Sequence, residues 1–358
     1  MRGVVYEAPH EMRLASLDDP RVVEETDVVV RMSLAAICGS DLHGYHRGDA
    51  MGIPAGARIG HEFVGTVEAA GDDVRSVRPG DKVLAPSWIS CGTCWFCRRE
   101  LYTSCEHGGC FGWPAMWGAG GAVEGGQSEL VRVPLADGTL ERIPDALAGE
   151  EFDHRVLPLG DVFSTGFHAL SGTRPEPGDT ILVIGDGAVG LMSCHAARLF
   201  GPAAIVLAGH HDDRLALGRR LGATHVVDGE GAEMRALLAR LTGGRGPDVV
   251  IASVSHPDVM RTACEVARPG GRVGWVGMEV FFAPPEIPWD VAWFKNLSLT
   301  GGVCPSRRYI RRLWPLLEQG RIEPSAVFTH TVGLEGVPAA YAAMAAREPG
   351  WVKVAVRP

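Results

Sequence analysis

The chain has 358 residues, 46% of them apolar and 22% charged, which suits about two globular domains and argues against disorder. A formal net charge of −9 argues against a nucleic-acid-binding protein, which usually carries a basic face. No apolar run approaches the roughly 18 residues that a membrane span needs, and the first residues do not resemble a signal peptide. We therefore expect a cytoplasmic protein with neither nucleic-acid nor membrane partners. In that compartment, clustered cysteines indicate metal binding before disulfides.

The first half of the chain is predicted to be rich in strands. Short runs of β-branched residues recur and are separated by turn-forming residues; they lie at 28–32, 63–67, 82–84 and 130–133. The character of the sequence changes near residue 156. The first of the two expected domains therefore covers residues 1–155.

From residue 180 the chain alternates apolar strands with helices. The run 181–184 is apolar throughout, as in a parallel strand that is buried on both faces. Further strands are expected at 204–208, 225–228, 249–251 and 271–276, and helices at 189–200, 212–221, 232–241 and 259–267. This repetition predicts an α/β domain with a doubly wound parallel sheet over 156–299. A helix at 307–318 and a strand at 351–356 complete the chain.

Four cysteines fall within a short segment, at Cys91, Cys94, Cys97 and Cys105. Four thiolates close the tetrahedral coordination sphere of Zn²⁺ and leave no open position, so this pattern predicts a structural zinc site. Two disulfides or free core thiols are the alternatives.

A second set of candidate metal ligands is spread along the chain, at Cys38, His61 and Asp161. One thiolate, one imidazole and one carboxylate leave a fourth position for water or substrate, as in a catalytic zinc site. From spacing alone this interpretation is weak, because a lone Cys, His or Asp is more often structural.

Residues 183–190 contain G-x-G-x-x-G between a buried strand and a helix. In dinucleotide-binding folds the first glycine permits the tight turn, the second lets the pyrophosphate approach, and the third permits close helix packing. The predicted cofactor contacts are Gly185, Gly187, Ala188, Val189 and Gly190.

The choice between NAD and NADP is predicted from the residue at the end of the second strand. In NAD-binding proteins this residue is an acid that forms a hydrogen bond with the ribose 2′-hydroxyl. Gly209 stands there, and His210, His211 and Arg214 could bind a 2′-phosphate, which favours NADP(H). On this basis Gly209→Asp should favour NAD. Alternatively, Asp212 or Asp213 takes the acid's role, or these residues only begin a helix with Asp212 as its N-cap.

Taken in order, these motifs resemble the zinc-dependent medium-chain alcohol dehydrogenases. The resemblance includes CGSDLH at 38–43, GHEFVGTVEAAG at 60–71, RPGDKV at 78–83, the four cysteines, LGDVFSTGFHAL at 159–170 and VIGDGAVG at 183–190. It implies a GroES-like catalytic domain, to which 300–358 return, and a Rossmann domain.

The resemblance also implies roles for individual residues. Cys38, His61 and Asp161 correspond to the ligands of the catalytic zinc, and Glu62 to a carboxylate beside the metal that replaces water as a ligand in some members. Ser40 and His43 correspond to a proton relay that runs through the cofactor ribose. Thr165 corresponds to a hydroxyl that packs beside the nicotinamide.

The expected activity is hydride transfer between NADP(H) and an alcohol or polyol, or the matching carbonyl compound, with two zinc ions per chain. An NAD-dependent sugar or polyol dehydrogenase is the alternative. Zinc-independent quinone reductases and non-enzymatic crystallin-type relatives lack features that are present here. A homo-oligomer, dimer or tetramer, follows by analogy. Trp88, Trp113, Trp117 and Met278 lie on segments that could line the substrate cleft.

Overall fold

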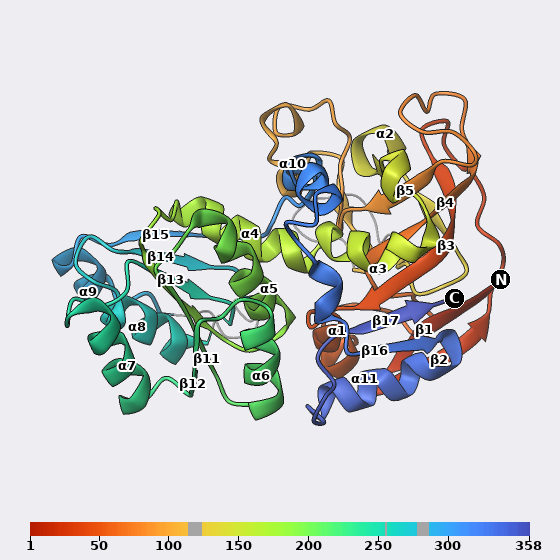
Figure 1. Ribbon diagram of the computed structural model, residues 1–358. Helices are drawn as coiled ribbons and strands as arrows, with labels where there is room; N and C mark the ends of the chain where they lie inside the picture. The colour runs from red at the N-terminus through yellow and green to blue at the C-terminus, as the bar shows by residue number, and fades with distance from the viewer. Residues whose placement is uncertain (114–123, 255, 278–285) are drawn as a thin grey trace. The chain divides into compact units, whose positions relative to one another are not determined.

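The computed structural model describes residues 1–113, 124–254, 256–277 and 286–358 (Figure 1). The chain forms two compact units, one made of Met1–Asp161 with Pro305–Pro358 and the other of Val162–Cys304. The domain bounds expected from the sequence differ from these by a few residues at each junction. Within the described ranges, no helix has both the length and the apolar character to cross a membrane.

The unit Val162–Cys304 is built on a six-stranded sheet whose strands are all parallel. Their order is β12-β11-β10-β13-β14-β15. After β10 the chain first adds β11 and β12 on one side, and then returns to add β13, β14 and β15 on the other side. Ligands bind at such a reversal in open α/β sheets, outside the carboxyl ends of the strands. The strands are β10 (Thr180–Ile184), β11 (Ala204–Gly209), β12 (His225–Asp228), β13 (Val249–Ala252), β14 (Arg272–Trp275) and β15 (Ser298–Gly301).

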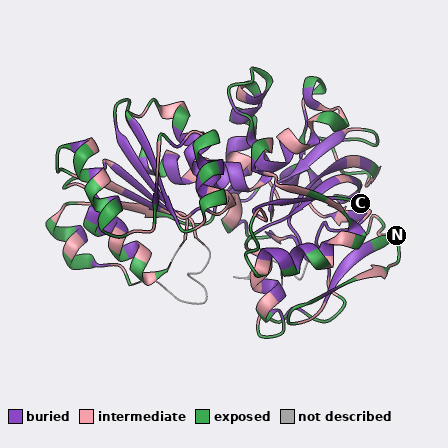
Figure 2. Cartoon of the chain, turned by 60° about the horizontal axis from the view of Figure 1, so that its bottom comes forward, coloured by how far each residue is buried: buried purple, intermediate pink, exposed green. Residues whose placement is uncertain are grey.

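Helices cover both faces of this sheet (Figure 1). One face carries α4 (Val162–Thr173), α5 (Ala188–Ala197) and α6 (Asp212–Arg220), and the other α7 (Ala232–Thr242), α8 (Pro257–Val266) and α9 (Trp289–Phe294). Figure 2 shows the sheet buried between helices whose outer sides are exposed. Every residue of β10 is buried, because apolar side chains on both of its faces pack under helices. The doubly wound sheet expected from the sequence is confirmed.

The other unit contains a seven-stranded, mainly antiparallel sheet. Its strands run in the order β16-β17-β3-β4-β5-β9, and β8 pairs with β3. Their bounds are β3 (Val28–Ile37), β4 (Glu62–Ala70), β5 (Lys82–Ala85), β8 (Leu130–Val133), β9 (Glu141–Arg142), β16 (His330–Gly333) and β17 (Val354–Arg357). The last strand of the chain therefore lies beside β3, from the first part of the sequence.

Smaller elements complete this unit. A hairpin of β1 (Arg2–Ala8) and β2 (Glu11–Ser16) and a short pair, β6 (Trp88–Ile89) with β7 (Gly109–Cys110), flank the sheet. The helices are α1 (Asp41–Arg47), α2 (Ala136–Thr139), α3 (Asp153–Val156), α10 (Arg307–Glu318) and α11 (Val337–Ala345). Helix α10 has the bounds predicted from the sequence, and β17 begins three residues later than the predicted 351. Side chains of β3, β4 and β17 form one core with Tyr341 of α11.

Candidate functional site

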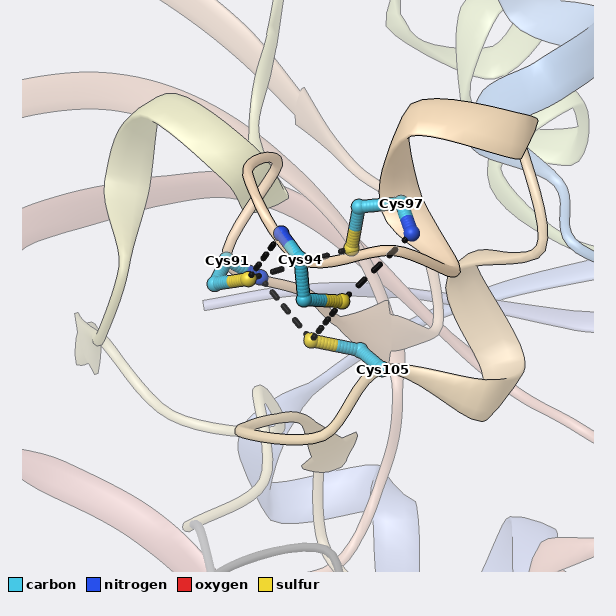
Figure 3. Close-up of side chains that lie close together, drawn as sticks. All are labelled: Cys91, Cys94, Cys97 and Cys105. Carbon is cyan, nitrogen blue, oxygen red and sulfur yellow. Dashed lines mark hydrogen bonds between the residues drawn. The ribbon is translucent and has the colours of Figure 1, made fainter.

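The four clustered cysteines converge on one point (Figure 3). The Sγ atoms of Cys91 and Cys97 are 3.9 Å apart, and those of Cys94 and Cys105 are 4.0 Å apart. A tetrahedron of zinc–sulfur bonds of about 2.3 Å has edges of about 3.8 Å, so these spacings fit the metal. All four cysteines are free thiols, which removes the disulfide alternative.

Backbone N–H groups of the same loop point at these sulfurs. The N–H of Cys94 donates to Cys91 Sγ at 3.3 Å, that of Cys97 to Cys94 Sγ at 3.5 Å, and that of His107 to Cys105 Sγ at 3.4 Å. Burial raises the pKa of Cys94, but donors such as the N–H of Cys97 outweigh it and lower the pKa to about 6. These donors therefore stabilise the thiolate form of Cys94, the form that binds zinc, whereas burial and the neighbouring thiols raise the pKa of Cys97 and of Cys105.

A second group gathers residues from three separate segments of the same unit. Cys38 follows β3, His61 and Glu62 lie at the start of β4, and Asp161 ends the 3₁₀ turn η5 (Leu157–Gly160). Pairing of β3 with β4 brings the first two segments together. Asp161 Oδ2 lies 3.3 Å from Cys38 Sγ and 3.5 Å from His61 Nε2. All four residues offer a ligand atom within 4.8 Å of the others.

The imidazole of His61 is held from its far side. Its Nδ1 lies 3.1 Å from Asp41 Oδ1, and the other Asp41 oxygen accepts the N–H of Cys38 at 2.9 Å. Burial lowers the pKa of His61, but Asp41 and Asp161 outweigh burial and raise this pKa well above its usual value. Asp41 therefore orients the imidazole so that Nε2 faces Cys38 and Asp161. Carboxylates often orient metal-binding histidines in this way, through the ring nitrogen that does not bind the metal.

Glu62 completes this group and has a partner that the sequence did not reveal. One of its oxygens accepts a hydrogen bond from Lys353, which immediately precedes β17. Its other oxygen, Oε2, is buried, and no described residue forms a hydrogen bond with it. Burial raises the pKa of Glu62 to about 7 although Lys353 opposes the shift, and burial with Asp161 raises the pKa of Cys38 to about 11. A buried thiol, imidazole and two carboxyl groups, one with an oxygen that no described residue pairs, fit a divalent cation, which would stabilise their deprotonated forms.

The two residues of the predicted proton relay lie at the start of α1. Ser40 is the N-cap of this helix, and its Oγ lies 3.3 Å from His61 Nε2. The N–H of His43 donates to the carbonyl of Ser40 at 3.0 Å, and the His43 side chain is half-buried. The fold thus places Ser40 at the candidate metal group and His43 one turn further along. Thr165 is buried in α4 of the other unit.

The glycine loop has the geometry of a phosphate cradle. Gly185 adopts a φ of 109°, a conformation that L side chains rarely adopt. A Cβ at Gly190 would lie 1.9 Å from the carbonyl oxygen of Gly185, whereas a Cβ at Gly187 would meet no described atom within 4 Å. Helix α5 starts directly afterwards at Ala188, with Val189 in its first turn. The open backbone before a helix N-terminus fits a dinucleotide pyrophosphate.

The end of β11 differs in detail from the sequence prediction. Gly209 is its last residue, but His211, not Asp212, is the N-cap of α6, with no side-chain capping bond. A Cβ at Gly209 would lie 2.5 Å from Asp186 Oδ2. Gly209→Asp would therefore clash with an existing carboxylate, so it is not the clean test of cofactor choice expected from the sequence.

The four candidate cleft residues divide into two pairs. Trp88 is half-buried and Trp113 is buried, whereas Trp117 and Met278 lie outside the described residues.

Comparison with known proteins assigns the chain to a family. The model of the alcohol dehydrogenase GroES-like domain matches residues 24–145, and that of the zinc-binding dehydrogenases matches residues 188–319. A medium-chain reductase/dehydrogenase of an Acremonium species is 37% identical over 77% of this chain and 93% of its own length. A probable zinc-binding alcohol dehydrogenase of Mycobacterium tuberculosis is 33% identical over 100% of this chain and 89% of its own.

A solved structure shares the whole fold. The alcohol dehydrogenase TADH from Thermus sp. ATN1 superposes with a TM-score of 0.91 at 35% identity, covering 100% of this chain and 99% of that one. The chain belongs to the zinc-type alcohol dehydrogenases of the medium-chain dehydrogenase/reductase family, and is an oxidoreductase with a GroES-like and a Rossmann domain.

Proposed function

We propose that the protein transfers a hydride between an alcohol or polyol, or the matching aldehyde or ketone, and a nicotinamide dinucleotide at a zinc site made by Cys38, His61 and Asp161. The observation that carries this proposal is the convergence of those ligand atoms beside Glu62 Oε2, which has no hydrogen-bond partner among the described residues. Three protein ligands leave a coordination position for substrate, which is the mark of a catalytic zinc.

The bound groups supply the reactive chemistry, since zinc polarises the substrate oxygen and the nicotinamide exchanges the hydride. The chain's own residues orient the site and move the proton. Asp41 holds His61 in position, and Ser40 lies beside that imidazole. In alcohol oxidation the Ser40 hydroxyl would accept the proton of the substrate hydroxyl while it gives up its own, and that second proton would leave to solvent by way of His43.

Two cofactors remain candidates. Gly209 lacks the acid that reads the ribose 2′-hydroxyl, and together with His210, His211 and Arg214 it supports NADP(H). The alternative, NAD(H), is favoured by a specific observation: the carboxylate of Asp186 lies beside Gly209. Ala188 and Val189 follow Gly187 at the phosphate end of either cofactor.

The other expected features are part of the same proposal. Cys91, Cys94, Cys97 and Cys105 hold a second, structural zinc, Thr165 packs beside the nicotinamide, and the protein works as a homo-oligomer in the cytoplasm. Light scattering at several concentrations tests the oligomer, because a monomer at all of them would contradict it.

The test of the activity is a panel of simple alcohols and polyols, scored by the absorbance of the reduced nicotinamide with each cofactor. Native protein should oxidise members of the panel, and Cys38→Ser should reduce turnover by at least about 10³-fold, because the site loses a ligand. Cys264→Ser is the matched control, since Cys264 is a buried thiol in α8 of the other unit and belongs to neither metal group. Near-normal turnover in Cys38→Ser would contradict the proposed zinc site.

A further inference from the structure

Asp186, between the first two glycines of the glycine loop, carries its side chain across to the neighbouring strand. Its Oδ2 accepts the N–H groups of His210 and His211 at 2.8 and 2.9 Å. The same oxygen lies 3.0 Å from Nδ1 of His211. The Asp186 side chain is only 8% exposed, so this carboxylate is fixed at the carboxyl end of β11.

The carboxylate fills the space that a side chain at Gly209 would enter. An ideal Cβ on Gly209 would lie 2.5 Å from Asp186 Oδ2 and 2.7 Å from its Cγ. The strands explain this placement, because β10 and β11 are paired and Ile184 lies opposite Ala208. Two residues beyond Ile184, the chain is therefore next to the end of β11. In dinucleotide-binding folds an acid at the end of the second strand accepts a hydrogen bond from the ribose. Here the acid at that place is Asp186, which follows β10 and not β11.

The basic residues near Gly209 each face an acid. Arg214 Nη1 lies 3.9 Å from Asp186 Oδ1. His210 lies 3.7 Å from Asp228 and 3.4 Å from Glu230. Of the three basic residues, one is an arginine and two are histidines. Three carboxylates lie beside these basic residues and offset the positive charge that a 2′-phosphate would need.

We propose that Asp186 is the specificity-determining acid of the cofactor site: it replaces the acid missing at Gly209, accepts a ribose hydroxyl, and selects NAD(H) over NADP(H). This inference rests on the proposed dinucleotide-dependent function. It reverses the cofactor preference predicted from Gly209 alone, because the acid is supplied in space by another part of the chain.

The test is fluorescence titration of the purified protein with NADH and, separately, NADPH, without substrate. Native protein should bind NADH at least about tenfold more tightly than NADPH, because the 2′-phosphate meets the buried carboxylate. Asp186→Asn keeps an oxygen for the N–H groups of His210 and His211 but removes the charge. It should tighten NADPH binding by about tenfold or more and leave NADH binding within about threefold.

Asp212→Asn is the matched control. Asp212 is exposed at the start of α6, so its substitution removes one negative charge from the same region. The ratio of the two dissociation constants should then change by less than about threefold, as expected for a solvent-screened charge. Circular dichroism and thermal melting establish that each variant is folded.

Two results overturn the role of Asp186: tighter binding of NADPH by the native protein, or an unchanged ratio in Asp186→Asn. The first result is measured on the native protein, so it can overturn the proposal even if Asp186→Asn does not fold. Failure of the native protein to bind either dinucleotide is a different outcome, because it overturns the proposed function itself.

Discussion

Lys353 donates a hydrogen bond to Glu62 in the interior of the GroES-like unit, and neither side chain has exposed surface. The two residues are 291 positions apart in the chain and meet because β17 pairs with β3, which in turn pairs with β4. Burial lowers the pKa of Lys353, but the charge of Glu62 outweighs it and raises this pKa above its usual value. The ammonium group is thus the permanent counter-charge of a carboxylate beside the candidate metal.

Lys353→Met should destabilise the protein by about 3–5 kcal/mol, because it leaves Glu62 buried without its partner. Urea unfolding of zinc-loaded and zinc-free protein measures the loss, which should be larger without zinc. Glu62→Gln combined with Lys353→Met should cost less than the sum of the single changes, and Lys353→Arg should restore most of the stability. An unfolding midpoint of Lys353→Met equal to that of the native protein would show that the pair contributes nothing.

Elemental analysis should find two zinc ions per chain in the native protein. Cys38→Ser and Cys97→Ser should each retain one, because each substitution opens a separate site. Cys97→Ser should also lower the melting temperature more than Cys38→Ser, since four thiolates crosslink a loop with little core of its own. A native content of one zinc would remove one of the two sites.

Ser40→Ala should reduce kcat/KM for alcohol oxidation by about 10²-fold or more, as loss of a proton-transfer group does. The variant should keep its zinc content and its affinity for the reduced cofactor, because Ser40 lies beside His61 Nε2 without being one of the expected ligands. Ser40→Thr keeps a hydroxyl and should recover much of the rate. Equal rates for Ser40→Ala and the native protein would contradict the relay.

Asp248 should give the Rossmann unit a pH-dependent stability. It accepts the N–H of Thr180 at 2.8 Å and the Nε–H of Arg268 at 2.6 Å. Burial raises the pKa of Asp248, but these donors outweigh burial and lower it below its usual value. A lowered folded-state pKa means that the stabilisation is present above the unfolded pKa of about 3.9 and is lost as pH falls through the folded pKa.

The corresponding variant is Asp248→Asn. It should lower stability to urea at pH 7 by about 1 kcal/mol, allowing for solvent screening of a partly exposed group, and the difference should shrink as the pH falls below about 4. Asp290→Asn, at an exposed position of α9, is the control and should change nothing. A difference that grows as pH falls would contradict this sign.

The features that could be predicted from the sequence are those encoded over short stretches of chain. The four thiols from Cys91 to Cys105 lie close together before any long-range folding, so their spacing alone indicates the ligand set. The glycine loop is likewise recognisable from a buried strand, a turn and a helix start. Cys38, His61 and Asp161 are far apart, and only the resemblance to a family brought them together.

The features that sequence reasoning missed depend on spatial neighbours. The sequence pattern locates the ribose-binding acid by its distance along the chain from the glycine loop. In this chain that position is Gly209. Asp186 reaches the same point from the adjacent strand, and no count along the chain reveals that. Lys353 was missed for the same reason, because only the pairing of β17 with β3 explains its place beside Glu62.

The division of one unit between both ends of the chain has a consequence for its synthesis. Val162–Cys304 is continuous and can fold as soon as it has left the ribosome, whereas the sheet beside the candidate metal ligands lacks β16 and β17 until residues 330–357 emerge. Until then Glu62 has no ammonium partner, and the edge of β3 that β17 will cover is open. The nascent GroES-like unit is therefore prone to aggregation until β17 is made, and removing Val354–Arg357 should destabilise this unit strongly, because both the strand edge and the region beside Glu62 lose their cover.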